Sequence, residues 1–241
     1  GTDRYILKNC SFTLAGGCSY AVVGENGAGK TTIAKLIMGL YDGYEGDILI
    51  NGRNVKDYSY GELKGLVAAV FQDFARYELS VKENIGIGRI PHFSRAGSEE
   101  KEIEKICEEL NMTDWIRSFP DGFDTMLGKL EEGGVDLSGG QWQKIAIARL
   151  LYSKAPINIL DEPTAAMDAV AESKIYELFQ KLNMGKFNIL ITHRMGAARI
   201  ADEILVLQNG AVAEQGKHEQ LMTMENGVYR KMYESQRQWY E

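Results

Sequence analysis

The stretch GENGAGKT at Gly24–Thr31 constrains the fold of this chain more than any other feature of the sequence. A short apolar run at Cys18–Val23 precedes it, and apolar residues at helical spacing follow it in Thr31–Met38. These patterns predict a strand, a glycine turn and a helix. Glycines without side chains let consecutive backbone N–H groups converge on an anion, and the start of the helix adds the positive end of its dipole. The segment therefore predicts a phosphate-binding loop.

The loop also carries the side chains that a nucleotide site needs. It matches the pattern GxxxxGK[ST] in the strand, loop and helix context that this pattern requires. Lys30 can reach the β- and γ-phosphates of ATP and the Thr31 hydroxyl can ligate Mg²⁺, so ATP and Mg²⁺ are the expected ligands. The alternative, a glycine-rich turn with a surface lysine, is disfavoured by the flanking strand and helix. The residues expected to bind ATP are Gly24, Glu25, Asn26, Gly27, Ala28, Gly29, Lys30, Thr31 and Thr32.

Two adjacent carboxylates follow a second apolar run. Ile157–Leu160 predicts a strand, and Asp161 and Glu162 come directly after it. Ligands of open α/β sheets gather at the carboxyl ends of strands, so we expect both acids near the phosphate loop. Asp161 is placed to hold Mg²⁺ and Glu162 to activate the attacking water; the alternative is a pair of solvated loop acids. Asn158 interrupts the apolar run, which predicts that this strand is incompletely buried.

Strands and helices alternate in much of the chain, which predicts a mostly parallel sheet. The expected strand and helix pairs after the loop are Ile157–Leu160 with Ala169–Leu182, and Phe187–Ile191 with Met195–Ile200. Asn209-Gly210 lies between two further strand-like runs and predicts a hairpin. Residues 227–240 read as a closing helix.

The middle of the chain has helical patterns and little strand signal. Helices are expected at Glu99–Leu110, Thr113–Phe119 and Gln141–Ser153. The fold class is therefore α/β: a P-loop NTPase core with a mostly parallel sheet, an antiparallel β part and an inserted α-helical subdomain. We expect the catalytic core at about residues 1–73 and 156–241, and the helical subdomain at about residues 74–155.

Composition excludes several other classes of protein. The 241 residues carry a formal net charge of −7, which argues against nucleic acid as a partner. The chain has 3 cysteines without the spacing of a zinc site or a disulfide framework. No run approaches the roughly 18 apolar residues needed to cross a bilayer, and no signal peptide is evident. We expect a soluble domain, and the abrupt beginning suggests that further residues precede it.

Ser138 and Gln141 stand three positions apart in the stretch LSGGQ, ahead of an apolar helical pattern. This spacing is typical of a capping box, in which the two side chains satisfy backbone N–H groups at a helix start. A purely structural cap is one interpretation. The other adds an anion site, because the glycines leave the positive end of the helix accessible.

Taken in chain order, these motifs resemble the nucleotide-binding domain of an ATP-binding cassette (ABC) ATPase over essentially the whole chain. The resemblance rests on the phosphate loop, Gln72, LSGGQ, the Asp161-Glu162 pair and His193. It implies that Glu162, His193, Gln72 and Lys30 are catalytic, and that Thr31, Gln72 and Asp161 hold Mg²⁺. It also implies a head-to-tail dimer in which one subunit closes over the ATP of the other. The residues acting in trans would be Ser138, Gly139, Gly140, Gln141 and Asp168.

Other stretches resemble the exporter branch of this family, including FQDF around Gln72 and PDGFDT at Pro120–Thr125. The resemblance implies a homodimer or pseudo-homodimer at the cytoplasmic face of the cell membrane, joined to a transmembrane domain in the same polypeptide. The adenine-stacking aromatic of the family is expected before Gly1, with Tyr5 a weaker candidate.

Two alternative functions use the same motifs. One is a soluble ABC ATPase that is not linked to transport, for which a second cassette, a coiled-coil insertion or a basic patch would be expected. The other is a regulatory nucleotide-binding module without turnover. Lys30, Asp161, Glu162 and His193 argue against that second alternative because each has a role in hydrolysis.

Overall fold

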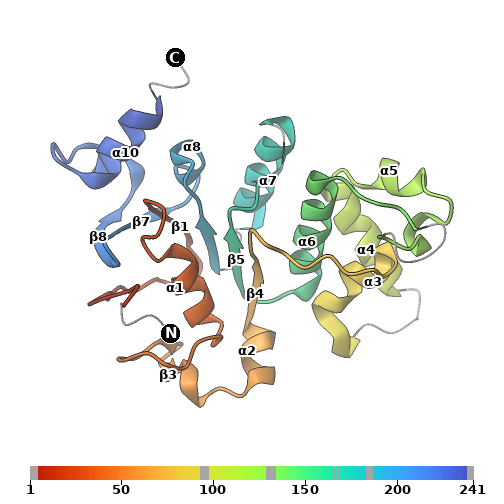
Figure 1. Ribbon diagram of the computed structural model, residues 1–241, viewed down its shortest axis with the longest axis horizontal. Helices are drawn as coiled ribbons and strands as arrows, with labels where there is room; N and C mark the ends of the chain where they lie inside the picture. Colours follow the sequence, from red (N-terminus) through yellow and green to blue (C-terminus); the bar gives the residue numbers. More distant parts are fainter. Residues whose placement is uncertain are drawn as a thin grey trace. The chain divides into compact units, whose positions relative to one another are not determined.

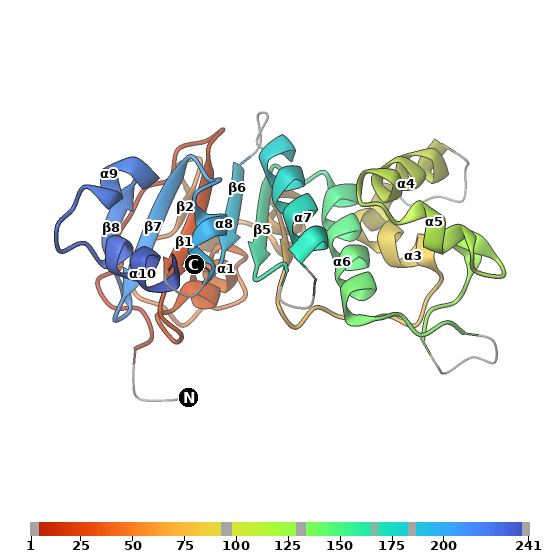
Figure 2. The ribbon, with the colours of Figure 1, turned by 90° about the horizontal axis from the view of Figure 1, so that it is seen from above.

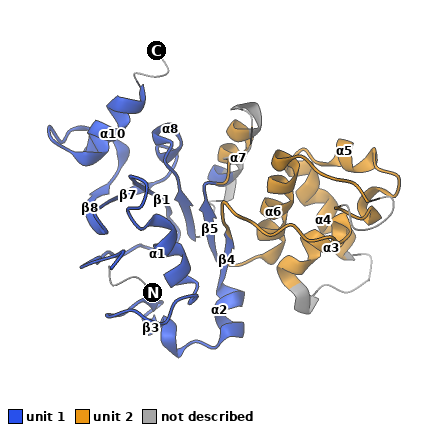
Figure 3. Ribbon diagram, viewed as in Figure 1, with its two compact units in different colours: residues 1–69, 156–162, 179–241 blue, residues 70–155, 163–178 orange. Residues whose placement is uncertain are grey.

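The computed structural model describes residues 5–92, 98–128, 134–164, 167, 169–182 and 187–237 (Figure 1). The chain forms two compact units (Figure 3). The first unit contains residues 1–69, 156–162 and 179–241, and the second contains residues 70–155 and 163–178. Within the described ranges, no helix is both long enough and apolar enough to cross a membrane.

A six-stranded sheet with the order β4-β5-β6-β1-β7-β8 carries the strand ends on which the site is built. Its strands are β1 (Ser19–Gly24), β4 (Val67–Val70), β5 (Ile157–Asp161), β6 (Phe187–Ile191), β7 (Glu203–Gln208) and β8 (Ala211–Gly216). β1 pairs in parallel with β6 and β7, and β5 pairs in parallel with β6. β8 is antiparallel to β7. The predicted α/β class with a mostly parallel sheet and an antiparallel part is confirmed.

The register brings the carboxyl ends of three strands together. Val22 and Asp161 are both registered with Ile191, one on each side of β6. Gly24 therefore leaves β1, Glu162 leaves β5 and Thr192 leaves β6 at the same edge of the sheet. This convergence is the one that parallel pairing predicts for ligand sites.

Helices of the first unit pack against this sheet. α1 (Lys30–Ile37) contacts β1 and β5. α8 (Met195–Ala198) and α10 (Val228–Arg237) pack against β1 and β7 through a buried apolar cluster (Figure 2). That cluster consists of Ala21, Val23, Met195, Ala198, Ile204, Val206, Leu221 and Tyr229. Ala21 and Val23 alternate with Tyr20 and Val22 along β1, so they share one face of the sheet.

Shorter elements complete the first unit. They are the hairpin strands β2 (Leu49–Ile50) and β3 (Arg53–Asn54), the 3₁₀ turn η1 (Val55–Asp57), α2 (Tyr60–Leu66) and α9 (His218–Met222). Asn51 and Gly52 both have positive φ in the turn between β2 and β3, with values of 51° and 81°. Paired positive φ angles are what a two-residue hairpin turn requires.

The second unit is helical apart from isolated bridges in its described part. Its elements are α3 (Val81–Gly86), η2 (Ile87–His92), α4 (Ser98–Glu109), α5 (Thr113–Arg117), η3 (Gly122–Asp124), α6 (Gly139–Ser153) and most of α7 (Ala169–Leu182). α6 packs against α3, α4 and η2. The Arg149 guanidinium of α6 donates to the backbone carbonyl of Asn84 at 2.9 Å and to its side-chain oxygen at 3.0 Å.

The expected helices and strands lie close to the observed ones, with small differences at their ends. α8 ends at Ala198 rather than at Ile200, and the described part of α10 ends at Arg237. The prediction that Asn158 leaves β5 incompletely buried is wrong. Asn158 is 1% exposed, and its side-chain amide nitrogen donates to the side-chain oxygen of Asn188 on β6 at 2.9 Å.

Candidate functional site

The phosphate loop leaves β1 at a glycine that no other residue could replace without strain. Gly24 has φ of 154°, and a Cβ there would lie 2.4 Å from the carbonyl oxygen of Leu207 on β7. Gly29, directly before α1, has φ of 101°, in the left-handed region that favours glycine. The following N–H groups of α1 have no partner inside the helix. The local backbone is thus built as an anion-binding cradle.

Lys30 points back into this loop. Its ammonium group donates to the carbonyl oxygens of Gly24 at 2.8 Å and Glu25 at 3.0 Å, and the residue is 8% exposed. Burial lowers the pKa of Lys30, and the nearby Glu162 and Asp161 carboxylates partly offset that effect. The lysine is therefore held beside the loop and close to both acids.

Thr31 joins the phosphate loop to the end of β5. Its hydroxyl donates to a carboxylate oxygen of Asp161 at 2.6 Å; Asp161 is 3% exposed, whereas Thr31 is open to solvent. Within the described ranges, no three His, Cys, Asp or Glu side chains form a group that could hold a metal ion. A hydroxyl beside one carboxylate fits Mg²⁺, which prefers oxygen ligands and usually takes others from water and phosphates.

Glu162 and His193 meet at the same edge of the sheet. The Nδ1 atom of His193 lies 2.5 Å from a carboxylate oxygen of Glu162; the two side chains are 53% and 15% exposed. Glu162 has φ of 52°, and its N–H donates to the carbonyl oxygen of Ile191 at 2.9 Å. A left-handed backbone at a residue other than glycine costs about 1–3 kcal/mol and marks candidate functional positions. Glu162 is therefore a candidate functional residue on its backbone conformation as well as on its contact with His193.

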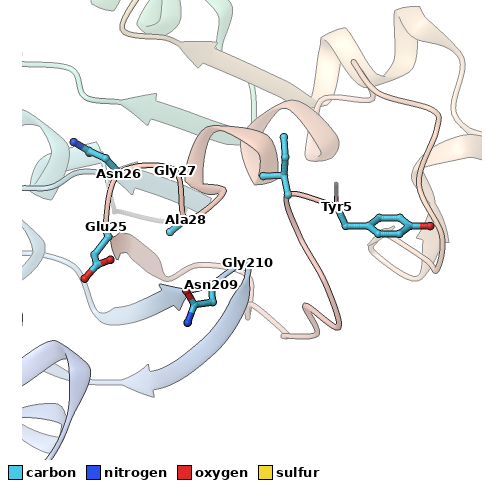
Figure 4. Close-up of a pocket in the computed structure, with 8 residues that line it drawn as sticks. Tyr5, Glu25, Asn26, Gly27, Ala28, Asn209 and Gly210 are labelled. Atoms are coloured by element: carbon cyan, nitrogen blue, oxygen red, sulfur yellow. The ribbon is translucent and has the colours of Figure 1, made fainter. Parts of the chain in front are cut away.

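A pocket of about 450 Å³ opens beside the phosphate loop (Figure 4). It is lined by Tyr5, Ile6, Glu25, Asn26, Gly27, Ala28, Asn209 and Gly210. The N-terminal segment forms one wall, because the Lys8 N–H donates to the carbonyl oxygen of Gly210 at 2.9 Å. The ring of Tyr5 points away from the loop, and its hydroxyl donates to Glu45 at 3.2 Å. This orientation does not suit stacking on a base inside the pocket.

The remaining predicted site residues belong to the second unit. Ser138 and Gln141 form the predicted capping box at the start of α6, with N–H to side-chain oxygen distances of 2.9 and 3.2 Å. Gln72 is exposed just after β4. Asp168 lies outside the described residues. The structure thus brings together Lys30, Thr31, Asp161, Glu162 and His193, whereas the approach of Gln72 and Ser138–Gln141 to a nucleotide stays a prediction.

Two features near the site are absent from the sequence predictions. Asn209 and Gly210 line the pocket, although their sequence indicated only a hairpin turn. Gln236 of α10 contacts the backbone on both sides of Arg194, within the segment that carries His193. No motif or spacing signals this second contact, because it depends on how α10 packs.

Comparisons with known proteins agree on one family. The sequence model described as ABC transporter matches residues 7–165. The chain is 41% identical to the subtilin transport ATP-binding protein SpaT of Bacillus subtilis, covering 95% of this chain and 37% of that protein. It is 37% identical to the mitochondrial iron-sulfur clusters transporter ATM1 of Saccharomyces cerevisiae, covering 96% and 32%.

The chain also matches a lipid A-core flippase in sequence and the solved structure of an exporter in fold. Identity to the ATP-dependent lipid A-core flippase of Photobacterium profundum is 39%, covering 97% of this chain and 38% of that protein. The structure of a bacterial Atm1-family ABC exporter with ATP bound matches with a TM-score of 0.88 and 35% identity, over 98% of this chain and 40% of that chain. The chain thus spans between 32% and 40% of the lengths of these proteins.

Proposed function

This chain belongs to the ABC transporter family and is an ATP-binding, ATP-hydrolysing domain of it, and we propose that it drives transport by an exporter of which it forms part. One observation carries the catalytic part of this proposal: the phosphate loop, the Thr31–Asp161 pair and the Glu162–His193 pair meet at the ends of neighbouring parallel strands. The phosphate loop, the Thr31–Asp161 pair and the Glu162–His193 pair all belong to the first unit.

The loop from Gly24 to Thr32 binds the nucleotide in this proposal. Its backbone N–H groups cradle the phosphates, and Lys30 exchanges its contacts with the carbonyls of Gly24 and Glu25 for the β- and γ-phosphates. Thr31 and Asp161, with Gln72 from the second unit, would hold Mg²⁺. When bound, that ion neutralises charge on the phosphates.

Hydrolysis requires a base beside the γ-phosphate. Glu162 is the general base in this proposal, and it takes a proton from the attacking water. His193 orients Glu162 and the water, which its 2.5 Å contact with the carboxylate supports. The left-handed backbone of Glu162 holds the side chain in place before substrate arrives, so little reorganisation is needed during the reaction.

The second unit supplies the other face of the site in a dimer. Ser138, Gly139, Gly140 and Gln141 at the start of α6, together with Asp168, would close over ATP held by the partner. In this proposal residues 1–73 and 156–241 form the catalytic core and residues 74–155 the helical subdomain. The compact units support a similar division but group residues 163–178 with the helices.

The partner of the dimer is a second nucleotide-binding domain, in a homodimer or pseudo-homodimer. A transmembrane domain, in the same polypeptide, would cross the membrane, with this domain at its cytoplasmic face. ATP-driven closure and hydrolysis-driven opening of the dimer would switch that membrane part between two access states. The names of the relatives, a transport ATP-binding protein, a transporter and a flippase, support an exporter without assigning its cargo.

The proposal is tested with the Glu162→Gln variant. We expect it to bind ATP, to hydrolyse it about 10²- to 10⁴-fold more slowly, and to form a dimer with ATP that light scattering detects. Adding Ser138→Arg should abolish the dimer, because a long cation replaces the cap at the closing surface. Glu219→Gln, on the short helix α9, is the matched control for loss of a carboxylate. Near-normal turnover by Glu162→Gln, or a dimer that forms equally without ATP, would contradict the proposal.

A further inference from the structure

The side-chain amide of Gln236, near the end of α10, bridges the backbone around His193. Its nitrogen donates to the carbonyl oxygen of His193 at 2.5 Å, and its oxygen accepts from the N–H of Met195 at 2.9 Å. These two groups flank Arg194. One side chain from the far end of the chain thus fixes the backbone on both sides of that residue.

The contact between Gln236 and Met195 caps the start of α8. Arg194 is the residue before this short helix, and its side chain makes no capping hydrogen bond. The first N–H groups of a helix have no partner inside the helix, so a cap from elsewhere stabilises them. Gln236 supplies that cap in place of a local Ser, Thr or Asp. The position at which α8 begins therefore depends on α10.

The other end of the His193 segment is held by the sheet. The Thr192 N–H donates to the carbonyl oxygen of Val22 on β1 at 3.2 Å, and the Arg194 N–H donates to the Thr192 hydroxyl at 3.0 Å. His193 lies between this strand anchor and the Gln236 bridge. Because its imidazole is 53% exposed, packing alone cannot fix its place, and the backbone contacts carry that task.

α10 is itself firmly attached where the bridge needs it. The Glu214 carboxylate on β8 accepts from the N–H groups of Val228 and Tyr229 at 2.5 and 3.0 Å, which caps the start of α10. Tyr229 is 0% exposed in the apolar cluster that also contains Met195. Further along α10, the Tyr233 hydroxyl accepts from Arg199 at 3.1 Å. These contacts attach α10 to β8 and to the apolar cluster, so the packing of α10 sets where Gln236 meets the His193 backbone.

We infer that Gln236 is a positioning residue for hydrolysis, which acts by holding the His193 backbone so that the imidazole meets Glu162. The inference rests on the proposed function, because it assigns His193 to the reaction. It places control of the catalytic pair partly in the C-terminal helix. Loss of the bridge should leave the nucleotide cradle intact and let the imidazole move from the carboxylate.

The variants for the test are Gln236→Met, which removes both hydrogen bonds at similar length, and Gln236→Glu, which keeps only the acceptor for Met195. The control Arg230→Gln removes the exposed ion pair between Arg230 and Glu234 on the same helix. ATP hydrolysis is measured in the longest natural polypeptide that contains this chain, under steady-state and single-turnover conditions. Each variant is also made in a His193→Ala background, and its thermal unfolding midpoint is recorded.

We expect Gln236→Met and Gln236→Glu to lower kcat between about 3-fold and about 30-fold, since misplacing a reacting group by about 1 Å can cost up to about 100-fold. KM for ATP should stay within about twofold of the parent value, because the cradle is untouched. Arg230→Gln should leave kcat unchanged. In the His193→Ala background the Gln236 variants should cause no further loss, because coupled residues are not additive.

An equal fall in kcat in both backgrounds would overturn the inference, since a general loss of stability would act with or without His193. An unchanged kcat in both Gln236 variants would also overturn it. Failure of the proposed function looks different: the parent would not hydrolyse ATP, or His193→Ala would hydrolyse it at the parent rate.

Discussion

The Thr31 hydroxyl lies 2.6 Å from a carboxylate oxygen of Asp161, although the two residues are 130 positions apart in the chain. β6 causes this approach, because β1 and β5 pair with its two sides in register. The bond links Thr31, in the first turn of α1, to Asp161, the last residue of β5. The Thr31 hydroxyl and the Asp161 carboxylate, both oxygen ligands of the kind that Mg²⁺ prefers, then lie beside the expected position of the ATP phosphates.

Thr31→Val should raise the Mg²⁺ requirement of hydrolysis. Valine keeps the shape of threonine but removes the hydroxyl, so a ligand is lost with little change in packing. We expect the free Mg²⁺ concentration for half-maximal ATPase activity to rise about tenfold or more, which corresponds to about 1.4 kcal/mol. Thr31→Ser keeps the hydroxyl and should stay near the parent value. Equal Mg²⁺ dependence of the valine and serine variants would remove Thr31 from the metal site.

Lys30→Ala should weaken nucleotide binding itself. The ammonium group would exchange two carbonyl contacts for phosphate oxygens, and hydrogen bonds to charged groups are worth about 1.5–3 kcal/mol. We therefore expect the dissociation constant for ATP, measured by calorimetry, to rise between about 10-fold and about 150-fold. Lys35→Ala, in the same helix, is the control for loss of one positive charge. An unchanged ATP affinity for Lys30→Ala would disprove the cradle role.

The strands and the phosphate loop could be predicted because their signals are local. The Cys18–Val23 run, the glycines and the following helix are contiguous, and β1 and α1 lie within one residue of the prediction. The turn residues Asn209-Gly210 predict a hairpin, and their φ values of 52° and 80° agree with it. Asn51-Gly52 carries the same signal and could have revealed the hairpin of β2 and β3.

The Glu162–His193 pair could be approached only indirectly from the sequence. Both residues follow strands, which predicts that they approach one sheet edge, but neither their 2.5 Å contact nor the left-handed backbone of Glu162 has a local sequence signal. Asn158 shows why the polarity of a single residue does not predict its burial. Its polarity indicated exposure, and only its pairing with Asn188 on the neighbouring strand explains why it is buried.

The Asn158–Asn188 pair should behave as one unit in unfolding experiments. Asn158→Leu removes the donor to the Asn188 side-chain oxygen in a fully buried place, which should cost about 1–3 kcal/mol. Replacing both residues by leucine should cost less than the sum of the single changes, since the hydrogen bond between them can be lost only once. Urea unfolding of the single and double variants measures this coupling. Strictly additive costs would mean that the hydrogen bond contributes nothing.

Asp202 should make the first unit sensitive to acid. The backbone N–H of Ser19 donates to the Asp202 carboxylate at 2.8 Å, and the Ser19 hydroxyl donates to it at 2.7 Å. These two hydrogen bonds, the backbone one first, lower the pKa of the Asp202 carboxyl below its ordinary value of 3.8. A lowered pKa means that the folded state prefers the charged form. The stability it contributes is therefore complete above pH 3.8 and is lost as the pH falls through the folded-state pKa.

The Asp202→Asn variant tests whether the charged carboxylate stabilises the folded state. At neutral pH it should unfold at a lower temperature than the parent, because asparagine cannot supply the charged acceptor that Ser19 contacts. The difference between the two unfolding midpoints should shrink as the pH falls below about 4, where the aspartate of the parent also becomes neutral. Asp42→Asn, at an exposed position, is the control and should shift the midpoint little at either pH. If the Asp202→Asn difference stays constant down to pH about 3, its cause is packing rather than charge, and the Ser19 contacts do not stabilise the carboxylate.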